Sequence, residues 1–204
     1  MADAGSVSVV GLIAGSSVVS AVVTVGVGWL RDKVKSSGAG DFAALYLAVA
    51  LEEYAAQCSS MISESENFDG SDGNFGVAWS NLPKLDEYPA KANLEALGIK
   101  YAQPAMNFQI KVDSYRAHLT GLWEFDDEET IRLARRFAAE LGVEALELSG
   151  NFRRARGLMP RIEVHEGWSM SDDLKTRKKR YDDLEREREQ RATEREAALV
   201  TNIV

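Results

Sequence analysis

The chain has 204 residues and a formal net charge of -8 at pH 7, with 45% hydrophobic and 27% charged residues. These averages are typical of a globular protein, and they exclude a collagen-like, a disulfide-rich or a wholly disordered chain. The single cysteine, Cys58, rules out an intrachain disulfide and suits a reducing compartment.

The average charge hides three unlike segments. Residues 1–35 carry a net charge of +1, residues 36–171 hold 12 basic against 21 acidic residues, and residues 172–204 hold nine of each. The acidity therefore belongs to the middle segment and argues against a nucleic-acid partner there. We expect an N-terminal segment 1–35, an acidic domain 40–160 and a charged segment 172–200.

The N-terminal segment contains an uncharged apolar run over residues 7–30, in which nine of 24 residues are valine. As a helix this run would be about 36 Å long, enough to cross a hydrocarbon core of about 30 Å. A cleaved signal peptide would need basic residues before the run, and a soluble core helix is rarely uncharged for so long. The run therefore predicts a transmembrane helix that anchors the chain in a lipid bilayer.

The residues around this run predict its orientation and contacts. Basic residues follow it and none precedes it, which favours a single-pass protein of the bacterial inner membrane with its N-terminus outside and its C-terminal domain in the cytoplasm. Trp29 lies at the junction, where an indole suits the lipid headgroups. Gly11 and Gly15 form a G-x-x-x-G pair through which two copies could associate, although glycine is common in spans. The topology-determining residues are Arg31, Lys33 and Lys35.

The first part of the acidic domain predicts one helix and one long loop. Gly38-Ala39-Gly40 predicts a flexible break, after which Asp41 would cap an amphipathic helix over residues 42–65. Residues 67–90 are rich in Gly, Asn, Asp and Pro, and they predict a loop. A calcium loop at residues 69–74 is disfavoured, because no register matches the EF-hand pattern.

Three more helical stretches follow this loop. Residues 93–97 predict a short helical turn. Pro104 suits the first turn of a second helix, which ends at Gly121. Asp126 or Asp127 would cap a third, long helix that ends near Gly157. Apolar residues recur at helical spacing through these stretches. The sequence therefore predicts an all-α fold with a small, three-helix bundle-like domain.

The C-terminal segment is dominated by charge, with 18 charged residues among the 25 from Asp172 to Glu196. Helix propensity is high but apolar residues are few, which predicts a solvated single helix or a weak coiled coil. A basic cluster could contact lipid headgroups or nucleic acid, although solvation explains it more simply. The headgroup-contact candidates, besides Trp29, are Lys175, Arg177, Lys178, Lys179 and Arg180.

One combination of features has a family likeness. The Val/Gly/Ser-rich start runs into Trp29-Leu-Arg-Asp-Lys-Val-Lys35, the stretch DFAALYLAVALEEYAAQC begins at Asp41, and a Leu-Pro loop begins at Asn81. The chain in this respect resembles uncharacterised single-anchor bacterial membrane proteins over roughly residues 5–160. The resemblance implies a transmembrane helix and a helical cytoplasmic domain, and it supplies no catalytic residues.

Sites of chemistry are sparse in this sequence. No nucleotide-binding loop, zinc motif or nucleophile elbow is present, and we expect no catalytic residue, metal or cofactor. Glu163, His165 and Glu166 would not converge on a metal from an extended chain, His118 suits a helix end, and Cys58 suits an apolar face. We therefore expect a membrane-tethered helical interaction or scaffold module with an unknown protein partner. The alternatives are a periplasmic structural tether of inverted topology and an enzyme with a dispersed carboxylate site.

Overall fold

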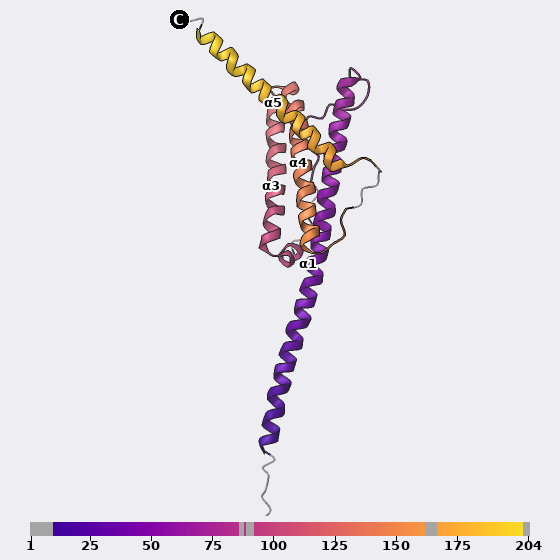
Figure 1. Cartoon of the computed structure of the whole chain (residues 1–204), viewed down its shortest axis with the longest axis vertical. Helices are drawn as coiled ribbons and strands as arrows, with labels where there is room; N and C mark the ends of the chain where they lie inside the picture. Colours follow the sequence, from indigo (N-terminus) through magenta and orange to yellow (C-terminus); the bar gives the residue numbers. More distant parts are fainter. Residues whose placement is uncertain (1–9, 86–87, 89–91, 162–166, 202–204) are drawn as a thin grey trace, which may run out of the picture.

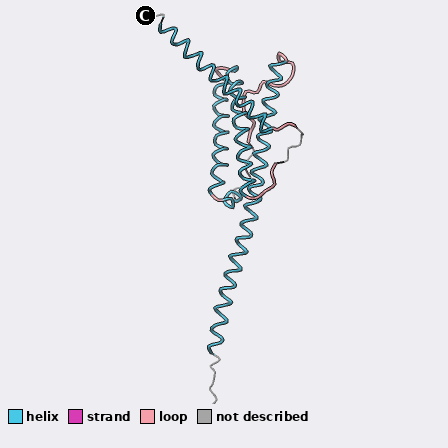
Figure 2. Tube along the Cα trace, viewed as in Figure 1, coloured by secondary structure: helices cyan, strands magenta, loops and turns pink. Residues whose placement is uncertain are grey.

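The structure is a computed structural model that describes residues 10–85, 88, 92–161 and 167–201. Side chains are described over the same ranges except residues 10–37, 92–93, 197 and 199–201. Every regular element among these residues is a helix, which confirms the predicted all-α class (Figure 2). In chain order the helices are α1 Val10–Gly70, α2 Ala92–Leu97, α3 Ile99–Trp123, α4 Asp127–Ala155 and α5 Met170–Thr201.

Helix α4 is the central helix of a bundle. It packs along α1 and also contacts α3 and α5, while the short α2 lies against α1 and α3 (Figure 1). Side chains also join α1 to α3, because the rings of Tyr54 and Phe108 meet edge to face with their centroids 5.7 Å apart. The N-terminal part of α1 projects from one end of the bundle, and the C-terminal part of α5 projects from the other (Figure 1).

The core lies mainly between α1 and α4, where small residues alternate with large ones. Both helices bury side chains at steps of three and four residues, the spacing of one helix face. Alanine at many of these positions allows the two backbones to lie close together while leucine and phenylalanine fill the remaining space. The buried core residues of the two helices include Ala44, Leu47, Leu51, Ala55, Cys58 and Ile62 of α1 and Ala134, Ala138, Leu141, Ala145 and Phe152 of α4.

The predicted break at Gly38-Ala39-Gly40 does not exist, because α1 runs through it without interruption. Asp41 therefore lies inside the helix and does not cap it. A Cβ added at Gly40 would lie 2.8 Å from the Ala96 carbonyl oxygen of α2 and 3.0 Å from the Arg156 guanidinium. The glycine serves close packing at this point rather than chain flexibility.

The predicted membrane anchor is also corrected. Among the helices whose side chains are described, none is both long enough and apolar enough to cross a membrane. This finding contradicts a single-pass inner-membrane protein. The part of α1 with described side chains, from Gly38 to Gly70, is acidic, and a hydrocarbon core excludes such charges. The predicted span over residues 7–30 lies outside the residues with described side chains. So do Gly11, Gly15 and Trp29, and the basic residues Arg31, Lys33 and Lys35.

The long loop starts later than predicted, because α1 reaches Gly70. The Ser71 hydroxyl accepts a 2.8 Å hydrogen bond from the Phe75 N–H and so closes the first turn. The chain then lies across α1 and α3. Leu82 and Leu85 are buried, and the Asn81 side chain donates to the Thr120 hydroxyl of α3 at 2.8 Å. This part of the loop belongs to the folded core.

Helix ends agree with the sequence at α4 more closely than at α3. The Asp126 carboxylate caps α4 by accepting a 2.8 Å hydrogen bond from the Glu129 N–H, as predicted. Gly157 follows the end of that helix with a φ of 62°. Helix α3, in contrast, begins at Ile99, so Pro104 lies more than one turn inside it, and the helix passes Gly121 to end at Trp123.

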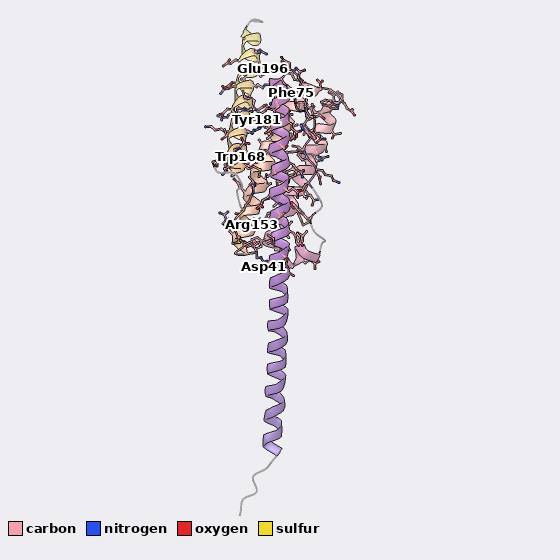
Figure 3. The ribbon with its side chains drawn as sticks, turned by 90° about the vertical axis from the view of Figure 1, so that its right-hand side faces the viewer. Asp41, Phe75, Arg153, Trp168, Tyr181 and Glu196 are labelled. Carbon is pink, nitrogen blue, oxygen red and sulfur yellow. The ribbon has the colours of Figure 1, made fainter. Side chains whose placement is uncertain are left out.

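Helix α5 differs from the prediction of a solvated helix in its first half. Met170 and Leu174 are buried, and Tyr181 packs against the core. From Arg186 to Glu196 every residue is exposed, so the prediction describes the second half (Figure 3, which labels Glu196). The first half of the helix is thus packed against the bundle, while the second half, which we call the free half, is exposed and contacts the bundle through the pair of Arg188 with Glu129 of α4 at 3.3 Å.

Candidate interaction surface

A stripe of exposed apolar side chains runs along α1 on a face that the bundle does not cover. Phe42, Tyr46 and Val49 are 63%, 57% and 46% exposed. Steps of four and three residues place them on one helix face, and the same steps lead on to Glu53, Ala56 and Ser60, which are also exposed. We call these six residues the α1 stripe. Its seven-residue repeat is the spacing by which helices pair in coiled coils.

Helix α3 also exposes apolar side chains, but with a less regular pattern. Ile99, Met106 and Ile110 are exposed, Ile110 by 64%. On the same face, the polar Gln103 lies between Ile99 and Met106, and the polar Asp113 follows Ile110. The α3 face therefore presents two large apolar side chains in succession, Met106 and Ile110, whereas the α1 stripe begins with three.

Most cations of the basic cluster predicted to contact headgroups form ion pairs within the protein. Arg177 pairs with Glu66 of α1 at 2.9 Å and with Asp173 of its own helix at 3.0 Å. Arg180 also pairs with Glu66, and Lys178 pairs with Asp182 at 2.6 Å. Lys175 and Lys179 are exposed. Arg177 and Arg180 therefore hold α5 against α1, a role that the sequence could not reveal because Glu66 is more than a hundred positions away, whereas Lys178 pairs within its own helix.

Glu52 is an enclosed charged group of α1, with its side chain 13% exposed. Arg153 of α4 donates to its two carboxylate oxygens at 2.7 and 2.9 Å, and the Ser149 hydroxyl also donates to it. Burial by itself would raise the pKa of Glu52, but the hydrogen bonds from Arg153 and Ser149 outweigh burial and lower the pKa below its usual value of 4.5. Glu52 and Arg153 therefore form an ion pair that remains charged at neutral pH.

The arginines at the end of α4 make different contacts. Arg153 also donates to the Met159 carbonyl at 2.9 Å, and Arg156 lies 3.6 Å from the Asp41 carboxylate. Arg154 donates to the Asn151 side chain at 2.7 Å. The helix-end role predicted from sequence is thus joined by tertiary contacts to α1.

The cysteine and histidine side chains that the structure describes lie in packing positions. Cys58 is fully buried, and burial raises the pKa of its thiol to about 12, as expected for an inert cysteine. His118 is exposed and lies near the Phe137 ring. Glu163, His165 and Glu166 lie outside the described residues. No group of three metal-ligating side chains comes together in the part of the chain that is described.

Comparison of the chain with models of protein families, with curated proteins and with solved structures finds no match.

Proposed function

We propose that this protein is a helical interaction module and that the α1 stripe is its docking face. The supporting observation is the exposure of Phe42, Tyr46 and Val49 in succession on a helix of 61 residues. Large apolar side chains that remain exposed in a contiguous row favour association with another protein surface. A continuous helix also presents them with fixed spacing, which a loop would not.

We assign a second copy of this chain as the occupant of the stripe. The seven-residue repeat is self-complementary, because two such helices can place apolar residues of one copy between those of the other. A two-fold pair uses the same patch on both subunits, so one stripe suffices for a closed dimer. Glu53 is the charged member of the stripe, and it would face its own copy in a parallel pair.

Sedimentation equilibrium of the full chain tests this proposal. The wild-type chain should show a concentration-dependent dimer, whereas Tyr46→Lys combined with Val49→Lys should remain a monomer, because buried, unpaired ammonium groups oppose association. Ile110→Lys is the matched control, since Ile110 is equally apolar and exposed on α3. A monomeric wild type, or equal dimerisation of all three chains, would refute the proposal.

A single introduced cysteine reports the orientation of the two copies. Val49→Cys places a thiol in the stripe, and the native Cys58 does not compete because it is fully buried. Parallel pairing should give a disulfide-linked dimer under mild oxidation, and Ile110→Cys should not. Glu53→Gln should then tighten the parallel dimer by removing a like-charge contact.

The alternative of an enzyme with dispersed carboxylates gains less support. The four described carboxyl groups with a shifted pKa, Glu52, Asp69, Glu129 and Asp182, all have it lowered. Each pairs with an arginine or a lysine. A general acid at neutral pH needs a raised pKa, so these groups suit structural ion pairing better.

A further inference from the structure

An open pocket of about 460 Å³ lies beside the end of α4 and the start of α5. Arg153, whose position at this end of the bundle is labelled in Figure 3, lines the pocket. Three further cations line it: Arg154 and Arg161 near the end of α4, and Lys175 on α5. The pocket shares no residue with the α1 stripe.

The base of this pocket is a fixed polar structure. The side chains of Glu52 and Arg153 are 13% and 14% exposed, and Arg153 also binds the Met159 carbonyl. Ser149 donates to Glu52 from the same helix as Arg153. Four groups from two helices and the following connection therefore hold one another, which gives the pocket a rigid base.

Among the described residues, the other cations of the pocket form no close ion pair. The described carboxylates leave Arg154, Arg161 and Lys175 unpaired within 4.0 Å. Arg154 binds the neutral Asn151, and Arg161 lies 3.9 Å from the Met170 sulfur. The lining holds four cations against two carboxylates, Glu52 and Glu147, whereas the whole chain has a charge of -8. A local positive potential in an acidic protein attracts anions to this place.

Apolar side chains complete the lining. Leu146 of α4 and Leu158 and Pro160 of the following connection face the pocket, and Gly150 adds no side chain. A volume of several hundred Å³ with apolar walls and a few charged groups is typical of a small-molecule site. A bare inorganic ion would leave these walls in contact with water.

We infer that this pocket binds a small amphiphilic anion, a molecule with a phosphate head and a short apolar body. Arg154, Arg161 and Lys175 would bind the head through charge-assisted hydrogen bonds. Leu146, Leu158 and Pro160 would cover the apolar body. Arg153 positions the site through Glu52 and need not contact the ligand.

Calorimetric titration of the full chain with three probes tests both parts of the ligand. Octyl phosphate should bind, inorganic phosphate should bind more weakly for lack of apolar contact, and octyl glucoside should not bind because its head is neutral. Added salt should weaken octyl phosphate binding. Equal binding of octyl glucoside and octyl phosphate would overturn the inference, since the apolar walls alone would then explain it. So would failure of octyl phosphate to bind.

Substitution of two exposed cations that line the pocket provides a second test. Arg154→Gln combined with Lys175→Gln should weaken octyl phosphate binding by at least about tenfold for each removed charge. Lys179→Gln is the matched control, because Lys179 is exposed on α5 outside the pocket. An unchanged melting temperature establishes that each variant is folded. Equal affinity of the double variant and the control would refute the assignment of these side chains, whatever the oligomeric state of the chain.

Discussion

Two interfaces of this protein hold helices together by different physical means. Between α1 and α4 the buried groups are mostly alanine and leucine, whereas α5 is attached to the same two helices by a network of charged side chains. Of the described α5 residues, Met170 and Leu174 are the buried ones. Apolar burial is not weakened by electrostatic screening, whereas partly exposed ion pairs are screened by salt. The bundle and its last helix should therefore respond differently to the same perturbation.

The network around α5 converges on Glu66 of α1. Its carboxylate accepts hydrogen bonds from Arg177 at 2.9 Å, from the Tyr181 hydroxyl at 2.8 Å, and from Arg180. Further pairs join α5 to α4, between Arg132 and Glu185 and between Arg136 and Asp182. Leu174 adds one apolar contact, since a Cβ at Gly142 of α4 would lie 3.1 Å from its side chain. Glycine at that position lets α5 approach closely.

The largest effect is expected in the apolar interface. Leu51→Ala removes a fully buried side chain and leaves a cavity, which should lower the free energy of unfolding by about 2–5 kcal/mol. Urea denaturation followed by circular dichroism measures this change. Leu184→Ala, at a position 47% exposed on α5, is the matched control and should have little effect. Equal losses in the two variants would contradict the comparison.

A slightly smaller effect is expected at the ion pair between α1 and α4. Arg153→Met leaves the enclosed Glu52 carboxylate without its cation and should cost about 3 kcal/mol in unfolding free energy. Adding Glu52→Gln to that variant should restore part of the loss. Urea midpoints of the two single variants, the double variant and the wild type give the coupling between the residues.

The same pair predicts a dependence of stability on pH. Because the pKa of Glu52 is lowered in the folded chain, its contribution is present above the unfolded value of 4.5 and is lost as the pH falls through the lower folded pKa. Urea titrations across that acidic range should show a smaller loss for Glu52→Gln than for the wild type. An identical acid dependence in both chains would contradict the assigned direction.

The α5 interface should show a weaker and salt-sensitive effect. Glu66→Gln removes the charge that three donors share and should destabilise the docking of α5 by about 1 kcal/mol, because the groups are partly exposed. Amide hydrogen exchange of α5 should accelerate in the variant, and also in the wild type at high salt, while exchange in α1 and α4 changes little. Glu187→Gln, in the free half of α5, should leave exchange unaltered.

The smallest effect is expected in the free half of α5. Arg186 pairs with Asp183 of its own helix, and their side chains are 68% and 43% exposed. Arg186→Gln should therefore change the unfolding free energy by less than about 0.5 kcal/mol. A thermal melt beside that of Glu66→Gln makes the comparison. A larger loss at Arg186 than at Glu66 would show that the two halves of α5 do not differ as the structure indicates.

Features fixed by neighbouring residues could be predicted from the sequence. The Asp126 cap, the short helix before Gly98 and the buried Cys58 follow from spacing and residue type over one or two turns. The exposure of Phe42, Tyr46 and Val49 could not be predicted, because an amphipathic pattern does not say which of its apolar residues the other helices cover. The pocket could not be predicted from the sequence either, because Lys175 and Arg154 belong to different helices.

The sequence by itself determined that the chain is helical and where several helices end, because backbone hydrogen bonds and caps act over three or four residues. Tertiary structure decided which glycine ends a helix and which one allows another helix to pack closely. Gly40 lies inside α1 and leaves room for the close approach of α2, a contact that no local pattern encodes. It also decided which charges are free: Arg153 and Arg177 are paired by Glu52 and Glu66, about a hundred positions away, while Arg154 and Lys175 face a pocket. Electrostatic and packing contacts depend on distance in space, and only folding sets that distance.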